Sequence, residues 1–462
     1  MADTLGAFPF WKVRFNKDGT PADAAAIDTF ASEVKSLGLT DLFIFSHGWN
    51  NDESDATWLY EQFFGQVGKL IDAGVNKKNP AAKIGVAGVI WPSILWPDDA
   101  PSRGPEPELP APAGGGTVGF AATPEKVPTS TASVPEVKSV LDKAYSGDAR
   151  QQTLIDDLVG LLVEQPDDEG AINTFRAKLG ELLTTETTGP IDASHPDDAE
   201  AGVAALSDKK WRALLREVAD DAEERGANKG GVVGLGDDFK KLWSGAKDLL
   251  RVGTYWQMKK RAGVVGQNGL AKIIVRLAEA SPDLRIHLLG HSFGARVVSF
   301  SLLGLSPTMT GPASPIKSLF LLQGAFSHNS FADQLPFDAS RSGALKGMAA
   351  RVDGPLLTTH SLRDYAVGVS YPAASMSNGE DAAAFESPSG RWGAMGHDGA
   401  QGVSATKLPL SPVGFEYPFG KGSWLNLDGN QIIIHGRLPS GAHSDIVHPE
   451  TAWAALSAAG IA

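Results

Sequence analysis

The first ninety or so residues alternate between short apolar runs and amphipathic segments. Residues 8–16 alternate apolar and polar side chains, whereas residues 40–50 and 82–93 contain largely apolar runs. These patterns predict one half-buried strand and two buried strands. Between the strands, residues 21–38 and 56–74 repeat apolar positions at helical spacing. Strands that alternate with helices favour the α/β fold class, with a mostly parallel sheet flanked by helices.

The alternation stops at about residue 96. Residues 96–133 are rich in Pro, Gly and Ala, and we predict a linker there. Residues 134–252 repeat apolar positions at helical spacing, which predicts a large helical insertion. The linker and insertion carry nearly all of the chain's net negative charge. We interpret this acidic helical block as a cap or lid domain, and the alternative is a helical insertion with no role in access.

The strand and helix pattern resumes after the insertion, so the predicted core comprises residues 1–95 and 253–462. In this second part the pattern predicts a long or broken helix at 254–280, a strand at 284–290, a helix at 295–304, strands at 314–326 and 354–362, an irregular region at 370–425, a strand at 431–437 and a helix at 449–460.

A serine stands at one of these strand–helix junctions, in Gly290-His291-Ser292-Phe293-Gly294. A strand that meets a helix almost without a loop forces a sharp turn, and the flanking glycines remove side chains that would collide there. The segment resembles the nucleophile elbow of the α/β-hydrolase superfamily. Within that superfamily the chain looks most like uncharacterised bacterial serine esterases. The alternative is a plain strand–helix junction whose serine caps the helix.

A second motif follows the strand at 40–50, where the chain reads His47-Gly48-Trp49. It looks like the His-Gly oxyanion loop of lipases and esterases. By that resemblance the backbone N–H groups of Trp49 and Phe293 would form an oxyanion hole. The alternative is that His47-Gly48 is merely a turn that ends a strand.

The resemblance implies that an acid and then a histidine follow the nucleophile along the chain. Asp364 lies just past the predicted strand at 354–362, which favours it as the acid over Asp333 and Asp338, both of which precede that strand. The alternative is that Asp364 is an ordinary carboxylate in a surface loop.

The histidine is expected in the loop between the last predicted strand and the last predicted helix. His443 lies in the middle of that loop and is our choice for the general base, with His448 at the helix start as the alternative. His435 falls within the predicted strand, and His397 precedes it, so both are less well placed.

Composition excludes several classes of partner and site. The 462-residue chain has a net charge of −13, which argues against nucleic acid as a partner. It has no cysteine, so disulfides and thiolate metal sites are excluded. Neither a signal peptide nor an apolar run of about 18 residues is present, so we expect a cytoplasmic protein without a transmembrane segment.

The resemblance therefore implies a serine hydrolase that cleaves a small-molecule carboxylic ester through an acyl-enzyme intermediate. Ser292, His443 and Asp364 would form its triad, and no metal or organic cofactor is expected. A thioesterase or an amidase would use the same groups. An alternative of another class is a non-catalytic, hydrolase-like scaffold that binds a protein partner through the helical insertion.

Overall fold

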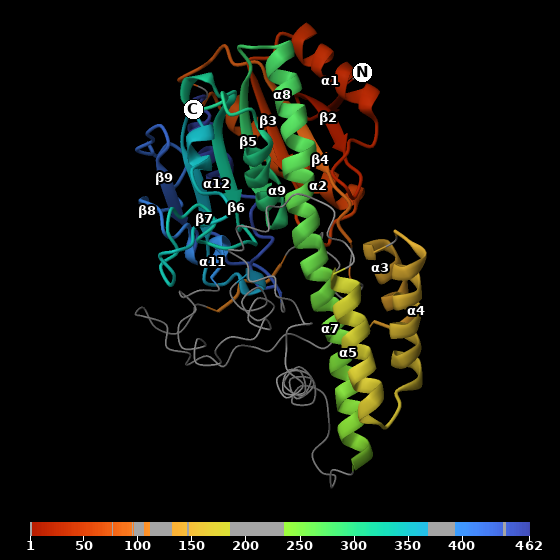
Figure 1. Cartoon of the computed structure of the whole chain (residues 1–462). Helices are drawn as coiled ribbons and strands as arrows, with labels where there is room; N and C mark the ends of the chain where they lie inside the picture. The colour runs from red at the N-terminus through yellow and green to blue at the C-terminus, as the bar shows by residue number, and fades with distance from the viewer. Residues whose placement is uncertain are drawn as a thin grey trace.

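The computed structural model of the chain describes residues 2–75, 77–94, 96, 106–110, 132–145, 147–184, 235–367, 393–437 and 440–462. Their strands form one nine-stranded sheet, in the order β1-β2-β4-β3-β5-β6-β7-β9-β8 (Figure 1). The strands are β1 (Asp3–Leu5), β2 (Phe8–Arg14), β3 (Asp41–Ser46), β4 (Ile84–Ile90), β5 (Arg285–His291), β6 (Ile316–Leu322), β7 (Leu356–His360), β8 (Ala405–Pro409) and β9 (Trp424–Asp428). β1 and β2 are antiparallel, and every other neighbouring pair in this sheet is parallel. The predicted α/β class with a mostly parallel sheet is confirmed.

Helices cover both faces of the sheet and form a separate apolar core on each. One core contains side chains of α1 (Ala24–Ser36), α8 (Ala271–Ala280) and α9 (Phe293–Ser301). The other contains side chains of α2 (Glu53–Asp72) and α12 (Pro449–Ala458). Within β3, Leu42 and Ile44 belong to the first core and Phe43 and Phe45 to the second, because successive strand side chains point to opposite faces. Within the described part of the core, the shorter helices are η4 (Leu302–Gly304), η5 (Gly311–Ala313), η6 (Met348–Arg351) and α11 (Met395–Asp398).

The prediction of a last strand at residues 431–437 is wrong. The last strand is β9, and β8 lies in the region predicted to be irregular. In the predicted strand, the backbone N–H groups of Ile434 and His435 donate to the carboxylate of Asp445 instead of to a sheet neighbour, at 2.8 Å each. β8 is an edge strand with no buried side chain, so it lacks the apolar signal that sequence patterns detect.

The helical insertion contains α3 (Val134–Tyr145), α4 (Ala149–Glu164), α5 (Glu169–Thr184) and α7 (Leu235–Val264) (Figure 1). Residues 185–234, which are part of the predicted helical insertion, lie outside the described residues. α7 continues through a π-helical turn, η3 (Val265–Leu270), directly into α8. This unbroken helix crosses the predicted boundary at residue 253. On its C-terminal side, the insertion is therefore joined to the core by a helix and not by a flexible segment.

A buried arginine links the insertion to the core. The guanidinium of Arg261 on α7 donates to the carbonyl oxygen of Ala144 at the end of α3, at 2.6 Å. It also donates to the carbonyl oxygen of Pro92, just after β4, at 2.8 Å. Hydrogen bonds from a charged donor to buried carbonyl groups fix both segments against α7.

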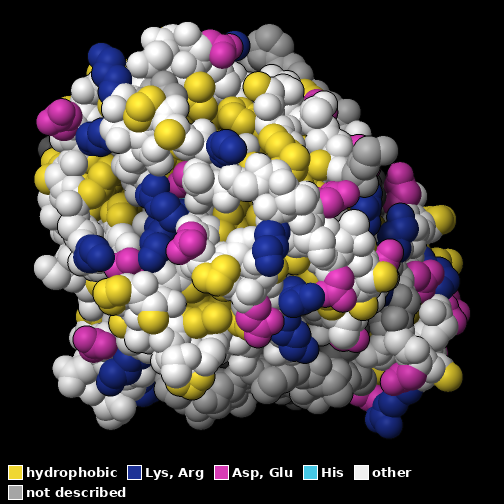
Figure 2. All heavy atoms as spheres, turned by 90° about the horizontal axis from the view of Figure 1, so that it is seen from above, with side chains coloured by type: hydrophobic (Ala, Val, Ile, Leu, Met, Phe, Trp, Pro, Cys, Tyr) yellow, Lys and Arg dark blue, Asp and Glu magenta, His cyan; other side chains and the backbone are white. Residues whose placement is uncertain are grey.

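The upper face of the core carries charged side chains of both signs. Figure 2 shows the face at the top of Figure 1, where basic and acidic side chains are interspersed without a large patch of one sign. Among the described helices, none combines the length and the apolar character that crossing a membrane requires.

Candidate active site

Ser292 lies at the sharp turn between β5 and α9, as the sequence predicted. Its backbone has φ 58° and ψ −125°, a conformation that few residues other than glycine adopt. The turn passes close to the end of β3, where a side chain at Gly294 would overlap the carbonyl oxygens of Ser46 and His47. The glycines in the motif are thus required for packing, and the strained serine marks a candidate functional position.

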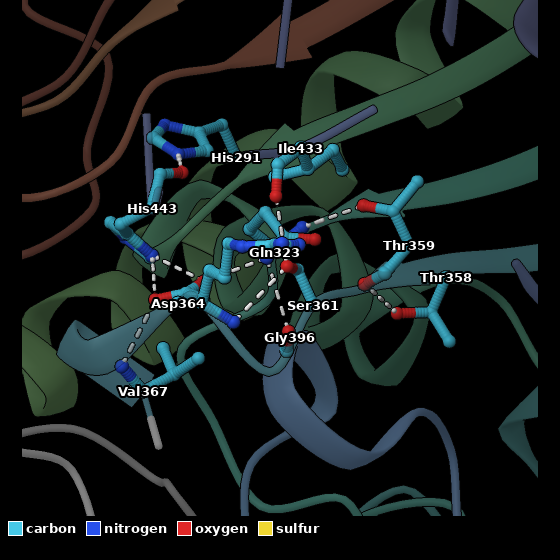
Figure 3. A network of polar contacts seen from close by, with 11 residues as sticks. His291, Gln323, Thr358, Thr359, Ser361, Asp364, Val367, Gly396, Ile433 and His443 are labelled. Carbon is cyan, nitrogen blue, oxygen red and sulfur yellow. Dashed lines mark hydrogen bonds and ion pairs between the residues drawn. The ribbon is translucent and has the colours of Figure 1, made fainter. Parts of the chain in front are cut away.

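Asp364 and His443 come together, although 79 positions separate them in the chain. The Nδ1–H of His443 donates to both carboxylate oxygens of Asp364, at 2.8 Å and 3.0 Å (Figure 3). Asp364 is fully buried, and the side chain of His443 is 12% exposed. A carboxylate can only accept, so Nδ1 carries the proton and Nε2 is left as the basic atom.

Two hydrogen bonds hold the backbone around His443, one with a neighbour of Asp364 and one with a neighbour of Ser292. The N–H of Ala442 donates to the carbonyl oxygen of Arg363 at 2.8 Å. His291 donates from Nε2 to the carbonyl oxygen of His443 at 2.9 Å, and the two rings lie 4.9 Å apart between centroids. Burial lowers the pKa of His291 to about 3, so this ring is neutral at physiological pH. The loop that carries His443 is therefore fixed beside Ser292.

The hydroxyl group of Ser292 makes no hydrogen bond to another described residue, His443 included. Catalytic hydrogen bonds in structures without substrate are often long, and they shorten when substrate binds.

Two backbone N–H groups are available close to the serine. Phe293 is the first residue of α9, where helix geometry leaves the N–H without a partner within the helix. Neither this N–H nor that of Trp49 is hydrogen-bonded to a described residue. Gly48 lies so close that an added Cβ would be 2.6 Å from the Cβ of Ser292. The structure thus places both predicted oxyanion donors next to Ser292.

His47 determines the direction of the Trp49 N–H. Its Nδ1 donates to the carbonyl oxygen of Gly48 at 2.8 Å, and its Nε2 accepts from the N–H of Trp91 at 3.4 Å. Because the C=O and N–H of a trans peptide point in opposite directions, holding the Gly48 carbonyl turns the Trp49 N–H to the other side. Burial lowers the pKa of His47 to about 4, which keeps this ring neutral.

Comparisons with models of protein families, with curated proteins and with solved structures find no significant match. Among the described residues, no group of His, Cys, Asp and Glu is arranged to hold a metal ion.

His448 and His435, which lie near His443 in the sequence, have partners of their own. His448 is the N-cap residue of α12, and its Nε2 lies 2.9 Å from Asp445 Oδ1. His435 also contacts Asp445, through Nδ1 at 3.2 Å. Both rings therefore help to shape the loop before α12, and neither is bonded to Asp364.

His397, Asp333 and Asp338 are likewise separate from the proposed triad. The Nδ1 atoms of His397 and His328 share the carboxylate of Asp398, at 2.8 Å and 3.0 Å. The carboxylate of Asp338 accepts two hydrogen bonds from Ser340 in a turn. Asp333 is exposed and, like Asp338, is not bonded to His443.

Two residues of the site were missed in the sequence. Tyr255 on α7 packs against Phe293 and Trp49, with ring centroids 4.9 Å and 5.5 Å apart. Gln323 follows β6 and donates from its side chain to Asp364 at 2.8 Å. Neither belongs to a recognisable motif. Gln323 fell inside the strand predicted at 314–326, so nothing in the sequence singled it out, whereas in the structure β6 ends at Leu322.

Proposed function

We propose that the chain is a serine hydrolase with the α/β-hydrolase fold and that it cleaves carboxylic esters. The observation that carries the proposal is the strained Ser292, which lies between two unbonded backbone N–H groups and a loop whose His443 is paired with a buried carboxylate. Acyl transfer by a serine requires these parts: a nucleophile, an oriented base and donors for the oxyanion.

In the proposed reaction, Ser292 Oγ attacks the carbonyl carbon of the ester while His443 Nε2 takes the hydroxyl proton. The N–H groups of Trp49 and Phe293 receive the negative charge that develops on the carbonyl oxygen. Asp364 stabilises the imidazolium and keeps its ring oriented. The intermediate expels the alcohol, which takes the proton from His443.

Water completes the cycle. It adds to the acyl-enzyme as His443 takes one of its protons, and the same proton returns to Ser292 Oγ when the carboxylic acid leaves. The chain supplies every group in this scheme, so it needs no cofactor. Thioesters and amides would react through the same steps, and a substrate panel distinguishes them.

The backbone of Ser292 argues against a non-catalytic scaffold. A non-glycine residue at this φ and ψ costs on the order of 1–3 kcal/mol, and such strain is usually retained where it serves function. A glycine in this position would relieve the strain, so a non-catalytic scaffold gains nothing from a serine there.

Helix α7, which crosses the boundary between the insertion and the core, contributes a wall of the proposed site through Tyr255, which packs against both residues of the oxyanion hole. Because α7 runs unbroken into α8, this wall is rigid on the C-terminal side of the insertion. The role proposed for the insertion is thus to shape the acyl pocket as a cap.

The decisive experiment is Ser292→Ala, measured with p-nitrophenyl butyrate and with a fluorophosphonate probe. We expect loss of labelling and a fall in kcat of three orders of magnitude or more, since the triad residues act as a unit. Ser299→Ala is the matched control, because Ser299 is a buried serine on the same helix whose hydroxyl group has no partner among the described residues. Labelling of another residue, or a Ser292→Ala variant with a tenth of wild-type activity, would exclude the proposal.

A further inference from the structure

Gln323 has an unusual backbone conformation. It follows directly after β6, at the same edge of the sheet as Ser292 and Asp364. Its φ is 46°, in the left-handed region that favours glycine, although its side chain is fully buried. Its backbone N–H donates to Thr359 Oγ1 at 3.1 Å, which fixes this conformation. A strained, buried, polar residue beside a candidate site points to a function for its side chain.

The surroundings determine how the amide is oriented. Its Nε2 lies 2.8 Å from Asp364 Oδ2 and 3.1 Å from the carbonyl oxygen of Gly396 (Figure 3). Both neighbours are acceptors, so the NH₂ group must face them and Oε1 must point the other way. Oε1 is buried and has no hydrogen-bond partner among the described residues. The chain thus leaves one polar atom unsatisfied in order to direct two N–H groups toward these acceptors.

We infer that Gln323 is a positioning residue of the proposed hydrolase, whose amide holds the carboxylate of Asp364 in the orientation that receives His443 Nδ1–H. This inference rests on the proposed function. The carboxylate is fully buried and accepts from three groups, namely Gln323, the N–H of Val367 at 3.2 Å, and His443. Without the amide, Oδ2 would lose its second donor and the carboxylate could rotate away from His443.

The chemistry of an amide suits this position better than that of a charged group. A lysine would neutralise Asp364 and so weaken its support for the imidazolium that forms during catalysis. A second carboxylate would repel Asp364 whenever both were ionised. A neutral donor fixes the acid and leaves its charge available to His443. The same amide also ties Asp364 to α11 through Gly396, so the acid is held by two elements that are distant in the sequence.

The test compares two substitutions of nearly the same length. Gln323→Met removes the donor, and we expect kcat to fall about 10- to 100-fold with KM unchanged, since a hydrogen bond to a buried charge is lost and no substrate contact is. Gln323→Glu restores a donor only while the new carboxyl group is protonated. Two carboxyl groups at this distance share a proton and release it at a higher pH than either would alone. The ratio of kcat for Gln323→Glu to kcat for the wild type should therefore be near one at acidic pH. This ratio should fall as the pH rises.

Gln401→Met is the matched control. Gln401 donates to the carbonyl oxygen of Asp398 in the same region and makes no contact with Asp364. It should retain wild-type kcat at every pH. Thermal unfolding of all three variants identifies any that does not fold, and the glutamate variant carries the test if the methionine variant fails to fold.

A readout independent of turnover is the downfield proton NMR signal of His443 Nδ1–H. We expect it in the wild type and its broadening or loss in Gln323→Met. A folded Gln323→Met variant with an unchanged signal and wild-type kcat would overturn the inference, as would a glutamate variant whose activity relative to wild type does not change with pH. If the wild type hydrolyses no ester and Ser292 is not labelled, the proposed function fails, while the NMR comparison still decides the role of Gln323.

Discussion

Adding one methyl group at Gly48 should move the oxyanion loop away from the nucleophile. The Cβ of an alanine there would lie 2.6 Å from the Cβ of Ser292 and 3.1 Å from its Oγ. Carbon atoms in packed proteins lie about 3.5–4.0 Å apart, so the two segments must separate by about 1 Å. Ser292 is fixed between β5 and α9, so the movement falls on the loop that carries the Trp49 N–H.

Such a displacement has a large expected effect on the rate. A misplacement of about 1 Å costs about 100-fold, which corresponds to about 2.7 kcal/mol in the activation barrier. The effect should appear in kcat, because the N–H stabilises charge that develops in the transition state. Overpacking should cost about 1–3 kcal/mol of folding stability.

The assay is kcat and KM for p-nitrophenyl butyrate, together with the rate of fluorophosphonate labelling and the melting temperature. Gly65→Ala is the control, because Gly65 is exposed within α2 and an added Cβ has no atom within 4 Å. We expect Gly65→Ala to retain wild-type activity and to gain about 0.5–1 kcal/mol in stability. A folded Gly48→Ala variant with wild-type kcat would refute the assignment of the oxyanion hole.

Three further predictions follow from the same geometry. His443→Ala should lose as much kcat as Ser292→Ala, whereas His448→Ala should lose less than about tenfold. The reverse ranking would assign the role of general base to His448. Tyr255→Ala should change the preference among acetate, butyrate and octanoate esters, measured as kcat/KM, and an unchanged preference would exclude α7 as a wall of the acyl pocket. Because burial lowers the pKa values of His47 and His291, the unfolded chain takes up protons that the folded chain does not. Stability should therefore fall below about pH 6.5, by roughly 1.4 kcal/mol per pH unit for each ring, and a melting temperature that does not change between pH 7 and 5 would contradict this.

The sequence was most informative where a local pattern determines a local structure. The strand that leads to Ser292 and the helix that follows it both appear in the structure, because a buried strand and a buried helix each need a continuous apolar pattern. The juxtaposition of Asp364 and His443 was also expected, but from a family resemblance in the order of residues and not from any local pattern.

The parts that could not be predicted depend on contacts between distant segments. β8 has no buried side chain, so its pairing with β9 leaves no mark in the apolar pattern. Tyr255 sits in a helix that reads as an ordinary amphipathic segment, and its contact with Trp49 follows from how α7 packs against the core. Gln323 becomes recognisable through its positive φ and its bond to Asp364, and both of these arise from the tertiary structure.

A second set of the same three residue types shows that hydrogen bonds alone do not define a catalytic triad. His287 accepts from Ser318 Oγ at 2.9 Å through Nδ1 and lies 3.0 Å from Asp41 Oδ1 through Nε2. This chain of bonds is more complete than that of the proposed site, yet all three side chains are at most 2% exposed. Ser318 lies within strand β6, where its backbone is not strained and no ester could approach its hydroxyl. The hydroxyl group of Ser292 makes no hydrogen bond to His443, but Ser292 lies at a strained turn beside two unbonded N–H groups. The fully bonded network of Asp41, His287 and Ser318 holds β3, β5 and β6 together. Catalysis instead requires groups that stay unbonded until a substrate binds. By that criterion Ser292 is the candidate nucleophile.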